Sequence, residues 1–148
     1  MSNSAEIPYS TTLLVRDTCL CLHVQRAARA LARLFDDALR PVGLTNGQFS
    51  LMMSLNRPEP PPMGPVANLL AMDQTTLTAA LKPLQRRGWV NVTPSPKDKR
   101  SRLLSLTAEG KSALAAAVPI WQSTHAMLED KLPGANGDGL RAMLLSLC

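Results

Sequence analysis

The sequence has few aromatic residues and no long apolar run. Phe, Trp and Tyr together make up 3% of its 148 residues, so a hydrophobic core has to be built from Leu, Ala, Val and Met. No apolar stretch approaches the ~20 residues that a membrane-spanning helix needs, and no signal peptide precedes a cleavage site. The three cysteines show no C-x-x-C spacing typical of a zinc site. These absences predict a cytoplasmic protein with reduced thiols, no membrane partner and no bound metal.

The common motifs of enzymes are also missing. His23 and His125 lie far apart in the sequence and show neither the H-x-x-x-H nor the H-E-x-x-H spacing of metal ligands. There is no G-x-S-x-G, no glycine-rich phosphate loop and no dinucleotide fingerprint. We therefore expect neither catalytic residues nor a cofactor.

What the sequence does contain is a series of helical patterns. Residues 1–16 are expected to form a flexible arm. A heptad-like apolar stripe follows in residues 17–39, with members three and four positions apart: Leu20, Val24, Ala27, Leu31, Leu34 and Ala38. A second such stripe runs from Leu114 to Leu132, ahead of a short amphipathic helix at the end of the chain. One stripe alone is compatible with packing inside a single subunit, but two predict a helical dimer.

The segment between the two stripes begins with a predicted helix and a stiff loop. Thr45 is the predicted N-cap of this helix, and Phe49, Met52 and Met53 are its predicted core positions. The following loop, residues 56–62, contains too many prolines for a helix. We interpret it as a rigid connector; a proline-rich ligand for another protein module is the alternative.

Residues 73–110 are predicted to fold as a helix, a strand, a basic turn, a second strand and the start of another helix. Asp73 is a good N-cap for the first helix, and Gly88 is placed to end it in a left-handed conformation. Residues 89–93 and 103–107 are rich in residues that favour strands. Pro83 lies inside the helix and is expected to bend it without dividing it.

The net charge of +5 lies entirely in this segment. From Asp73 to Lys111 there are eight Lys or Arg residues and three acids, while the rest of the chain has as many acids as bases. A basic patch confined to one element is typical of polyphosphate binding, although a solvated basic face is the simpler alternative. A helix followed by a basic β-hairpin is a winged helix, which favours double-stranded DNA as the partner.

The same segment resembles the MarR family of bacterial transcription regulators. The matching stretches are residues 73–78, 84–90, 98–100 and 106–110. The resemblance implies a mainly α fold with a small β-hairpin wing: a winged helix-turn-helix at residues 44–107, flanked by N- and C-terminal dimerisation helices at residues 17–43 and 108–148. It also implies a homodimer that binds a palindromic operator, acts as a repressor and is released by a small, aromatic or anionic ligand.

The DNA contacts are expected to be of three kinds. Small polar side chains on the first turns of the recognition helix suit base edges in the major groove, where Gln pairs with adenine and Thr or Ala contacts a thymine methyl group: Gln74, Thr75, Thr76, Thr78 and Ala79. Cations later in the helix suit phosphates: Lys82, Arg86 and Arg87. In the wing, Arg100 resembles the minor-groove arginine of the family. Asp98, two residues before it, is interpreted as an orienting partner for a wing arginine, with a DNA contact as the alternative. The other wing cations are Lys97, Lys99 and Arg102, for which solvation alone is the alternative.

The residues of the effector site are predicted from their chemistry. His23, Arg26 and Trp121 are candidates, since a cation and an aromatic wall suit a phenolic carboxylate. The alternative is that the histidines are satisfied within helix packing. Cys21 resembles the sensing cysteine of the organic-hydroperoxide branch of the family, but that branch holds its thiolate with tyrosines, and Tyr9 is the only tyrosine here. We therefore predict that Cys21 is a buried structural thiol. An architectural protein that binds DNA without sequence preference is the remaining interpretation.

Overall fold

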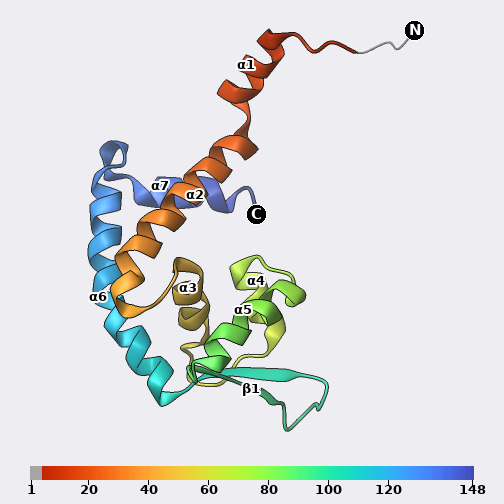
Figure 1. The fold of residues 1–148 in the computed structure, drawn as a ribbon, viewed down its shortest axis with the longest axis vertical. Coiled ribbons are helices and arrows are strands. Elements are labelled where there is room, and N and C mark those ends of the chain that lie inside the picture. The colour runs from red at the N-terminus through yellow and green to blue at the C-terminus, as the bar shows by residue number, and fades with distance from the viewer. Residues whose placement is uncertain (1–4) are drawn as a thin grey trace. The chain divides into compact units, whose positions relative to one another are not determined.

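The computed structural model describes residues 5–148 and shows a mainly helical chain (Figure 1). The described residues form seven α-helices: α1 (Tyr9–Thr18), α2 (Leu20–Leu39), α3 (Asn46–Leu55), α4 (Met63–Leu70), α5 (Gln74–Arg86), α6 (Ala108–Asp130) and α7 (Gly137–Leu145). They also contain an antiparallel hairpin of β1 (Val90–Pro94) and β2 (Arg102–Leu106), and two 3-10 helices, η1 (Arg40–Val42) and η2 (Pro133–Ala135). The predicted fold class, mainly α with a small β-hairpin, is confirmed. The chain divides into two compact units, Met1–Leu34 and Phe35–Cys148, which we describe separately.

The first unit contains α1 and most of α2. Residues 9–16 are helical, so the structure differs there from the flexible arm predicted for residues 1–16; residues 1–4 lie outside the described part of the chain. No proline or glycine, the strongest helix breakers, occurs between Pro8 and the end of α2, so residues 9–16 can form a helix. The extended backbone of Cys19 (φ −66°, ψ 111°) separates α1 from α2. No described residue of this unit is buried.

The hydrophobic core of the second unit is built from η1, α3, α4, α5, α6, the hairpin and the segments next to them. It is almost entirely aliphatic, as the shortage of aromatic residues predicts: Leu39, Leu44, Phe49, Leu51, Met52, Leu55, Val66, Ala67, Leu77, Leu81, Leu84, Val90, Leu104, Leu114 and Ala117. Phe49 and Met52 are buried as predicted, but Met53, also predicted for the core, is 40% exposed. Leu51 is buried in addition, because α3 packs against α4, α6 and β2 and therefore buries more than one narrow stripe.

The helices of this unit begin and end at local sequence signals. Thr45 forms a capping box at the start of α3. Thr107 Oγ1 accepts a hydrogen bond from the Gly110 N–H at 2.9 Å and so caps α6. Gly88 follows α5 in a left-handed conformation (φ 73°), as predicted. Helix α5 is one continuous helix despite Pro83.

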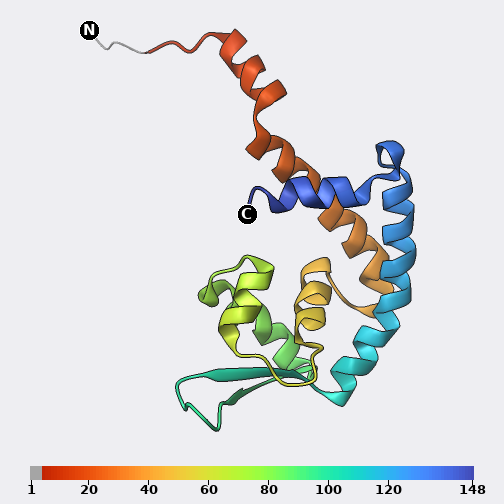
Figure 2. The ribbon, with the colours of Figure 1, turned by 180° about the vertical axis from the view of Figure 1, so that it is seen from behind.

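The proline-rich loop between α3 and α4 lies alongside the hairpin (Figure 2). β1 and β2 pair in register from Val90 opposite Leu106 onward, so each strand starts one residue away from its predicted position. The backbone N–H of Leu104 donates to the carbonyl oxygen of Pro61 at 2.9 Å. This contact joins the loop to β2 and supports its interpretation as a rigid connector.

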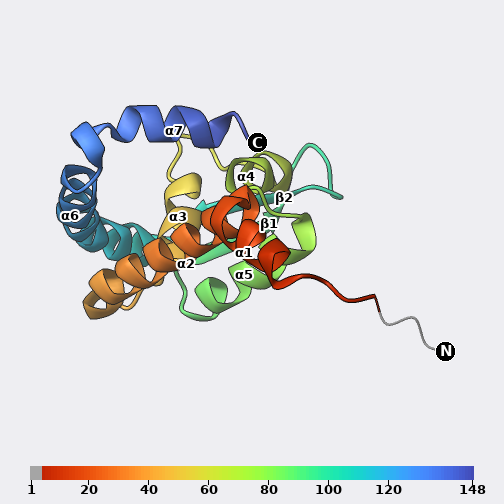
Figure 3. The same cartoon turned by 90° about the horizontal axis from the view of Figure 1, so that it is seen from above.

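Helix α7 turns away from the axis of α6 after η2 (Figure 3). Arg141 Nη2 lies 2.7 Å from Asp138 Oδ1, and Arg141 Nη1 pairs with Glu129 near the end of α6. The hydrogen bonds that Arg141 donates to these carboxylates, the one to Asp138 first, raise the pKa of Arg141. The ion pairs are exposed to solvent, so they orient the corner between the helices more than they stabilise the fold.

The described part of the chain contains neither a helix that could span a membrane nor a cluster of side chains that could bind a metal ion. Within residues 5–148, no helix combines the length and the apolar character that crossing a bilayer requires. The same residues contain no group of three His, Cys, Asp or Glu side chains that could hold a metal ion. All three cysteines are free.

The start of α6 packs directly against the backbone at the start of the hairpin, and this contact requires Gly110. A Cβ atom at this position would collide with the carbonyl oxygen of Trp89. We therefore expect Gly110→Ala to lower the free energy of unfolding by about 1–3 kcal/mol, as overpacking does elsewhere. Urea denaturation followed by circular dichroism measures this change in the free energy of unfolding.

The matched control for this substitution is Gly47→Ala, because Gly47 is also helical and has open space where its Cβ would lie. We expect Gly47→Ala to be neutral or to stabilise by roughly 0.5–1 kcal/mol. Equal effects of the two substitutions would contradict a tight contact between α6 and the Trp89 carbonyl.

Candidate nucleic-acid interface

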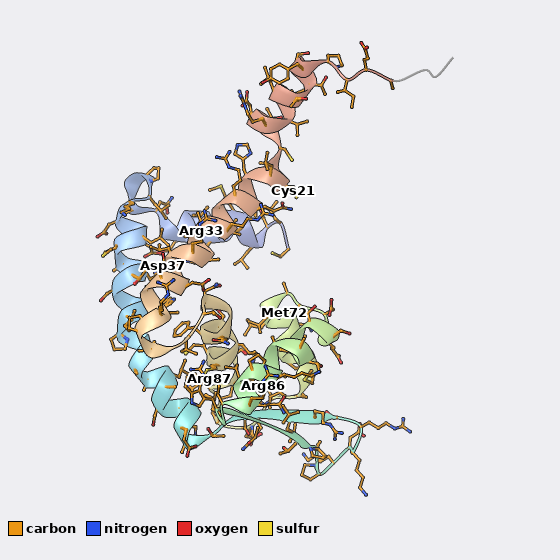
Figure 4. The ribbon with its side chains drawn as sticks, viewed as in Figure 1. Cys21, Arg33, Asp37, Met72, Arg86 and Arg87 are labelled. Atoms are coloured by element: carbon orange, nitrogen blue, oxygen red, sulfur yellow. The ribbon has the colours of Figure 1, made fainter. Side chains whose placement is uncertain are left out.

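Helices α4 and α5 form a helix-turn-helix whose connection is only three residues long. Ala71 ends α4 in a left-handed conformation (φ 53°), and its N–H donates to carbonyl oxygens of the last turn of α4. Met72 lies in the turn (Figure 4). Asp73 Oδ1 then accepts a hydrogen bond from the Thr76 N–H at 2.7 Å and caps α5. The start of the predicted recognition helix is therefore fixed by its own first residues and by a tight turn.

The exposed face of α5 brings together most of the predicted base contacts. The side chains that line a shallow hollow of about 340 Å³ on this face are Gln74, Thr75, Thr78, Ala79 and Lys82. Leu77, Leu81 and Leu84 point the other way and are buried. Thr76 is exposed but does not line the hollow, so the structure places it apart from the other predicted contacts.

Thr78 has a restricted hydrogen-bonding capacity on this face. Its hydroxyl donates to the carbonyl oxygen of Gln74 at 2.8 Å, one turn earlier in the helix. The hydroxyl proton is therefore occupied, and Thr78 offers a methyl group and an acceptor to a partner in the groove. Such a side chain suits the methyl group of a thymine better than it suits an acceptor atom on a base edge.

The cations at the end of α5 have two different environments (Figure 4). Lys82 and Arg86 are exposed, and neither forms an ion pair with a carboxylate of the described residues. Arg87 is engaged within the fold: Nη1 donates to the carbonyl oxygen of Gly43 at 2.6 Å, and its guanidinium lies 3.6 Å from the centre of the Trp89 ring. The Arg87 guanidinium therefore makes contacts within the fold while the residue stays exposed, and its phosphate contact stays a prediction.

The tip of the hairpin is an exposed cationic turn. Lys97, Lys99, Arg100 and Arg102 are all exposed, and none is paired with a described carboxylate. Asp98 Oδ1 accepts from the backbone N–H of Arg100 at 3.0 Å and not from its guanidinium. Asp98 therefore shapes the turn on which Arg100 stands, and it contacts the arginine through the backbone.

Trp121, a candidate for the effector site, borders a cavity of about 550 Å³ in the second unit. The indole stacks on His125 with ring centres 4.7 Å apart and on Phe49 at 6.0 Å. His125 is thus packed among aromatic rings, as the alternative interpretation of this histidine expected. The residues that line the cavity come from α3, α4 and α6: Phe49, Ser50, Met53, Ser54, Leu69, Leu70, Val118, Trp121 and Gln122.

Most of these cavity residues were missed by the sequence analysis, because they belong to three helices that no local pattern connects. The structure itself marks two of them, Met53 and Leu69. Each is a large apolar side chain that remains exposed, at 40% and 64%. Exposed apolar side chains that lie together are typical of a surface that a ligand or a partner covers.

His23 and Arg26, the other effector candidates, belong to the first unit. Together with Arg29 and Arg33 they line a hollow on α2 itself, and His23 Nδ1 lies 2.7 Å from the carbonyl oxygen of Cys19. This part of α2 is a cationic helix face. It contains two of the three predicted effector residues, while Trp121 lines the cavity described above.

Cys21 is exposed, which contradicts the prediction of a buried thiol. The reason is that α2 has no buried residue in the first unit, so an apolar position on this helix is not a core position. The Gln25 amide Nε2 donates to Cys21 Sγ at 3.2 Å. Cys19 is half-buried at the break between α1 and α2.

Comparisons with known proteins define the class to which this fold and site belong. The model of the MarR family matches residues 44–101. The DNA complex of the M. tuberculosis transcriptional regulator MOSR superposes with a TM-score of 0.81 at 35% identity, over 88% of this chain and 93% of that chain. The repressor CouR, bound to a 23-mer DNA duplex, gives a TM-score of 0.80 at 28% identity over 97% and 99% of the two chains.

Curated sequences agree with these structures. The transcriptional regulator HosA of Escherichia coli O111:H- is 37% identical over 93 residues, which are 62% of this chain and 67% of HosA. The matched stretches span 54% to 67% of the lengths of the first curated relatives. This chain belongs to the MarR family of transcriptional regulators.

The cap of α5 should make the stability of the protein depend on pH. The backbone N–H of Thr76 stabilises the Asp73 carboxylate and lowers its pKa below the ordinary value of 3.8. A carboxyl group with a lowered pKa in the folded state contributes stability above its unfolded-state pKa and loses it as the pH falls through the folded-state pKa. We expect Asp73→Ala to destabilise the protein at neutral pH, and the difference from the native chain to shrink below about pH 4.

Asp73→Asn is the matched control, because an asparagine also caps helices but does not titrate. It should retain most of the stability at neutral pH and remove part of the pH dependence between pH 3 and 5, a window on the order of one unit around the ordinary carboxyl pKa. Thermal unfolding of the three proteins across this window provides the measurement. A pH-independent difference between Asp73→Ala and the native chain would contradict the role of the charged carboxylate.

Proposed function

We propose that this regulator binds a palindromic double-stranded operator as a homodimer, with α5 in the major groove and the hairpin at the neighbouring minor groove. The observation that carries the proposal is the gathering of Gln74, Thr75, Thr78, Ala79 and Lys82 on one exposed face of a capped helix. A face of this kind, at the start of the second helix of a helix-turn-helix, suits base edges. MOSR and CouR, which share the fold, are each described in complex with DNA, and this supports DNA as the partner.

The phosphate contacts follow from the exposed cations beside this face. Lys82 and Arg86 extend from α5, and the wing tip adds Lys97, Lys99 and Arg102. Unpaired, exposed cations are suited to phosphates, because no carboxylate has to be displaced and counterions are released from the DNA. Arg100, on the turn that Asp98 shapes, is suited to a narrow A·T-rich minor groove.

The homodimer is supported by apolar side chains that each unit leaves exposed. On α2 these include Leu20, Val24, Leu31 and Leu34; on and after α7 they include Met143, Leu144, Leu145 and Leu147. Apolar surface of this extent is typical of an interface. The proposed dimerisation region is therefore residues 17–43 together with residues 108–148. The two-fold symmetry of the dimer would place two recognition helices about one turn of DNA apart, which requires a palindromic operator.

We propose further that the regulator is a repressor and that a small ligand in the cavity releases it from DNA. Leu69 and Leu70, in the last turn of α4, line the cavity, and only Ala71, Met72 and Asp73 separate them from α5. A ligand that packs against this turn would favour a position of α4 that differs from the DNA-bound one. Release then requires only that the ligand binds the DNA-free arrangement more tightly. CouR is described as a repressor, whereas another relative, BadR, is described as an activatory protein.

No catalytic activity and no cofactor form part of this proposal, and the function requires a cytoplasmic location with access to the chromosome. It is tested by capturing genomic fragments with the purified protein and titrating salt against binding to a captured and a shuffled duplex. We expect tighter binding to the captured duplex at every salt concentration, and a dimeric mass by light scattering at micromolar protein. Equal affinity for both duplexes would favour an architectural protein, and a monomeric mass would contradict the dimer.

The restricted hydrogen bonding of Thr78 predicts a contact with a thymine methyl group in the operator. Thr78→Ser keeps the hydroxyl and removes the methyl group, whereas Thr78→Val keeps the methyl group and removes the hydroxyl. We expect Thr78→Ser to bind more weakly by about 0.8 kcal/mol, the value of one buried methyl group, and Thr78→Val to bind nearly as well as the native protein.

Uracil in place of thymine provides the complementary change on the DNA. At the contacted position, uracil should weaken operator binding by the native protein by a similar amount. It should leave operator binding by the Thr78→Ser variant unchanged. Fluorescence anisotropy with the captured operator measures both effects. A loss of affinity in Thr78→Val that matches or exceeds the loss in Thr78→Ser would show that the hydroxyl, and not the methyl group, is used.

A further inference from the structure

The cavity between α3, α4 and α6 has the size and shape of a small-molecule site. Its volume of about 550 Å³ falls within the range of roughly 300–1,000 Å³ that is usual for such sites. All of its lining residues belong to the second unit, so the site is defined within one compact part of the chain. Its lining therefore indicates which chemical class of molecule the site accepts.

One wall of the cavity is a rigid aromatic stack. Trp121 lies between Phe49 and His125, with interplanar angles of 17° and 23° to their rings. The indole therefore packs against two further rings and presents an aromatic surface to the cavity. A planar ligand can pack along such a wall without disturbing the core.

The remaining apolar walls are accessible to solvent. Met53 on α3 is 40% exposed and Leu69 on α4 is 64% exposed, although both are large apolar side chains. A flat apolar molecule that fills the cavity would cover both of them. Covering exposed apolar area of this kind is the main favourable contribution to binding in such sites.

The polar groups of the lining are all neutral. They are the hydroxyls of Ser50 and Ser54 and the carboxamide of Gln122. The Ser54 hydroxyl donates to the carbonyl oxygen of Leu51, so its oxygen remains available as an acceptor, while the exposed Gln122 provides both donors and an acceptor. None of the nine lining residues carries an ionisable group. A carboxylate that packs against this lining would lose part of its hydration without gaining a cation from the nine lining residues, whereas an amide or a hydroxyl would find partners.

We infer that this cavity binds an uncharged, flat aromatic molecule with a neutral hydrogen-bonding group, in preference to an aromatic anion. The inference rests on the proposed function, since it names the ligand class of the effector site. It revises the expectation from the sequence, which combined Trp121 with the cations of α2 to accommodate a phenolic carboxylate.

The test compares two probes that differ only in charge, 2-naphthamide and 2-naphthoate, on the full-length protein at neutral pH. Isothermal titration calorimetry gives both dissociation constants, and quenching of Trp121 fluorescence in a Trp89→Phe background reports the location. We expect naphthamide to bind at least about tenfold more tightly than naphthoate. Naphthoate that binds as tightly as naphthamide, or no binding of either probe up to its solubility limit, overturns the inference.

A charge placed in the lining should reverse this preference. Gln122 is exposed on α6, so Gln122→Lys adds a cation to the cavity at little cost to folding. We expect this variant to gain about tenfold in affinity for naphthoate and to lose affinity for naphthamide. The matched control is Ser123→Lys, which adds the same charge at the adjacent exposed position outside the lining and should change neither constant. Equal gains in the two variants would show that the anion is bound elsewhere.

DNA binding separates this inference from the proposed function. If naphthamide binds in the cavity but the protein does not distinguish its operator from a shuffled duplex, the function is wrong and the ligand class stands. If the protein recognises its operator but prefers naphthoate, the ligand class is wrong and the function stands.

Discussion

The backbone at the end of the recognition helix, from Arg87 to Trp89, holds the second unit together. The Trp89 carbonyl oxygen accepts the Thr107 N–H at 3.0 Å, and the Thr107 hydroxyl donates to the Gly88 carbonyl oxygen at 2.7 Å. On its other side the Arg87 side chain reaches the Gly43 carbonyl oxygen, while its guanidinium lies on the Trp89 ring. One short segment therefore connects α5, the hairpin, the start of α6 and the end of η1. The orientation of the DNA-binding elements relative to α6 depends on it, and Gly110 is required because α6 begins so close to this backbone.

The opposite end of the recognition helix follows directly after residues that line the cavity. There α5 is joined to α4 by a turn that places Ala71, a residue with a side chain, in the left-handed region (φ 53°). The left-handed region is unfavourable in free energy for a residue with a side chain, so the surrounding contacts have to maintain this conformation. The contacts available are the Asp73 cap and the packing of Leu69 and Leu70, which also line the cavity. A ligand in the cavity would therefore act on the end of α5 that carries the predicted base contacts, while the junction at Trp89 keeps the other end in place.

The parts of the structure that were predictable from the sequence are those that depend on nearby residues. Caps at Thr45, Asp73 and Thr107, and the left-handed Gly88, are satisfied within a few positions of the chain, so the pattern alone reveals them. The same holds for the basic hairpin and for the exposed face of α5. An apolar stripe, in contrast, indicates only that one side of a helix is apolar. It does not indicate which element or partner covers that side. For this reason Cys21 was assigned to a buried position that the first unit does not provide.

Contacts between residues that are distant in the sequence could be identified only from the structure. Arg87 has the composition and the position of a phosphate contact, and only the approach of Gly43, 44 residues away, shows that its guanidinium is used within the fold. The cavity proposed as the effector site is a similar case, because three helices contribute its walls and its polar groups are serines and a glutamine that have no recognisable spacing.

Within the second unit, the two surfaces of functional interest thus differ in their chemistry. The DNA-facing surface is built from unpaired cations, which gain by contacting phosphates in water-rich surroundings, whereas the cavity is built from apolar and neutral polar groups, which gain by excluding water. A ligand suited to one surface is poorly suited to the other. This difference would allow a small molecule to control DNA binding from the cavity without competing for the cations that we propose as phosphate contacts.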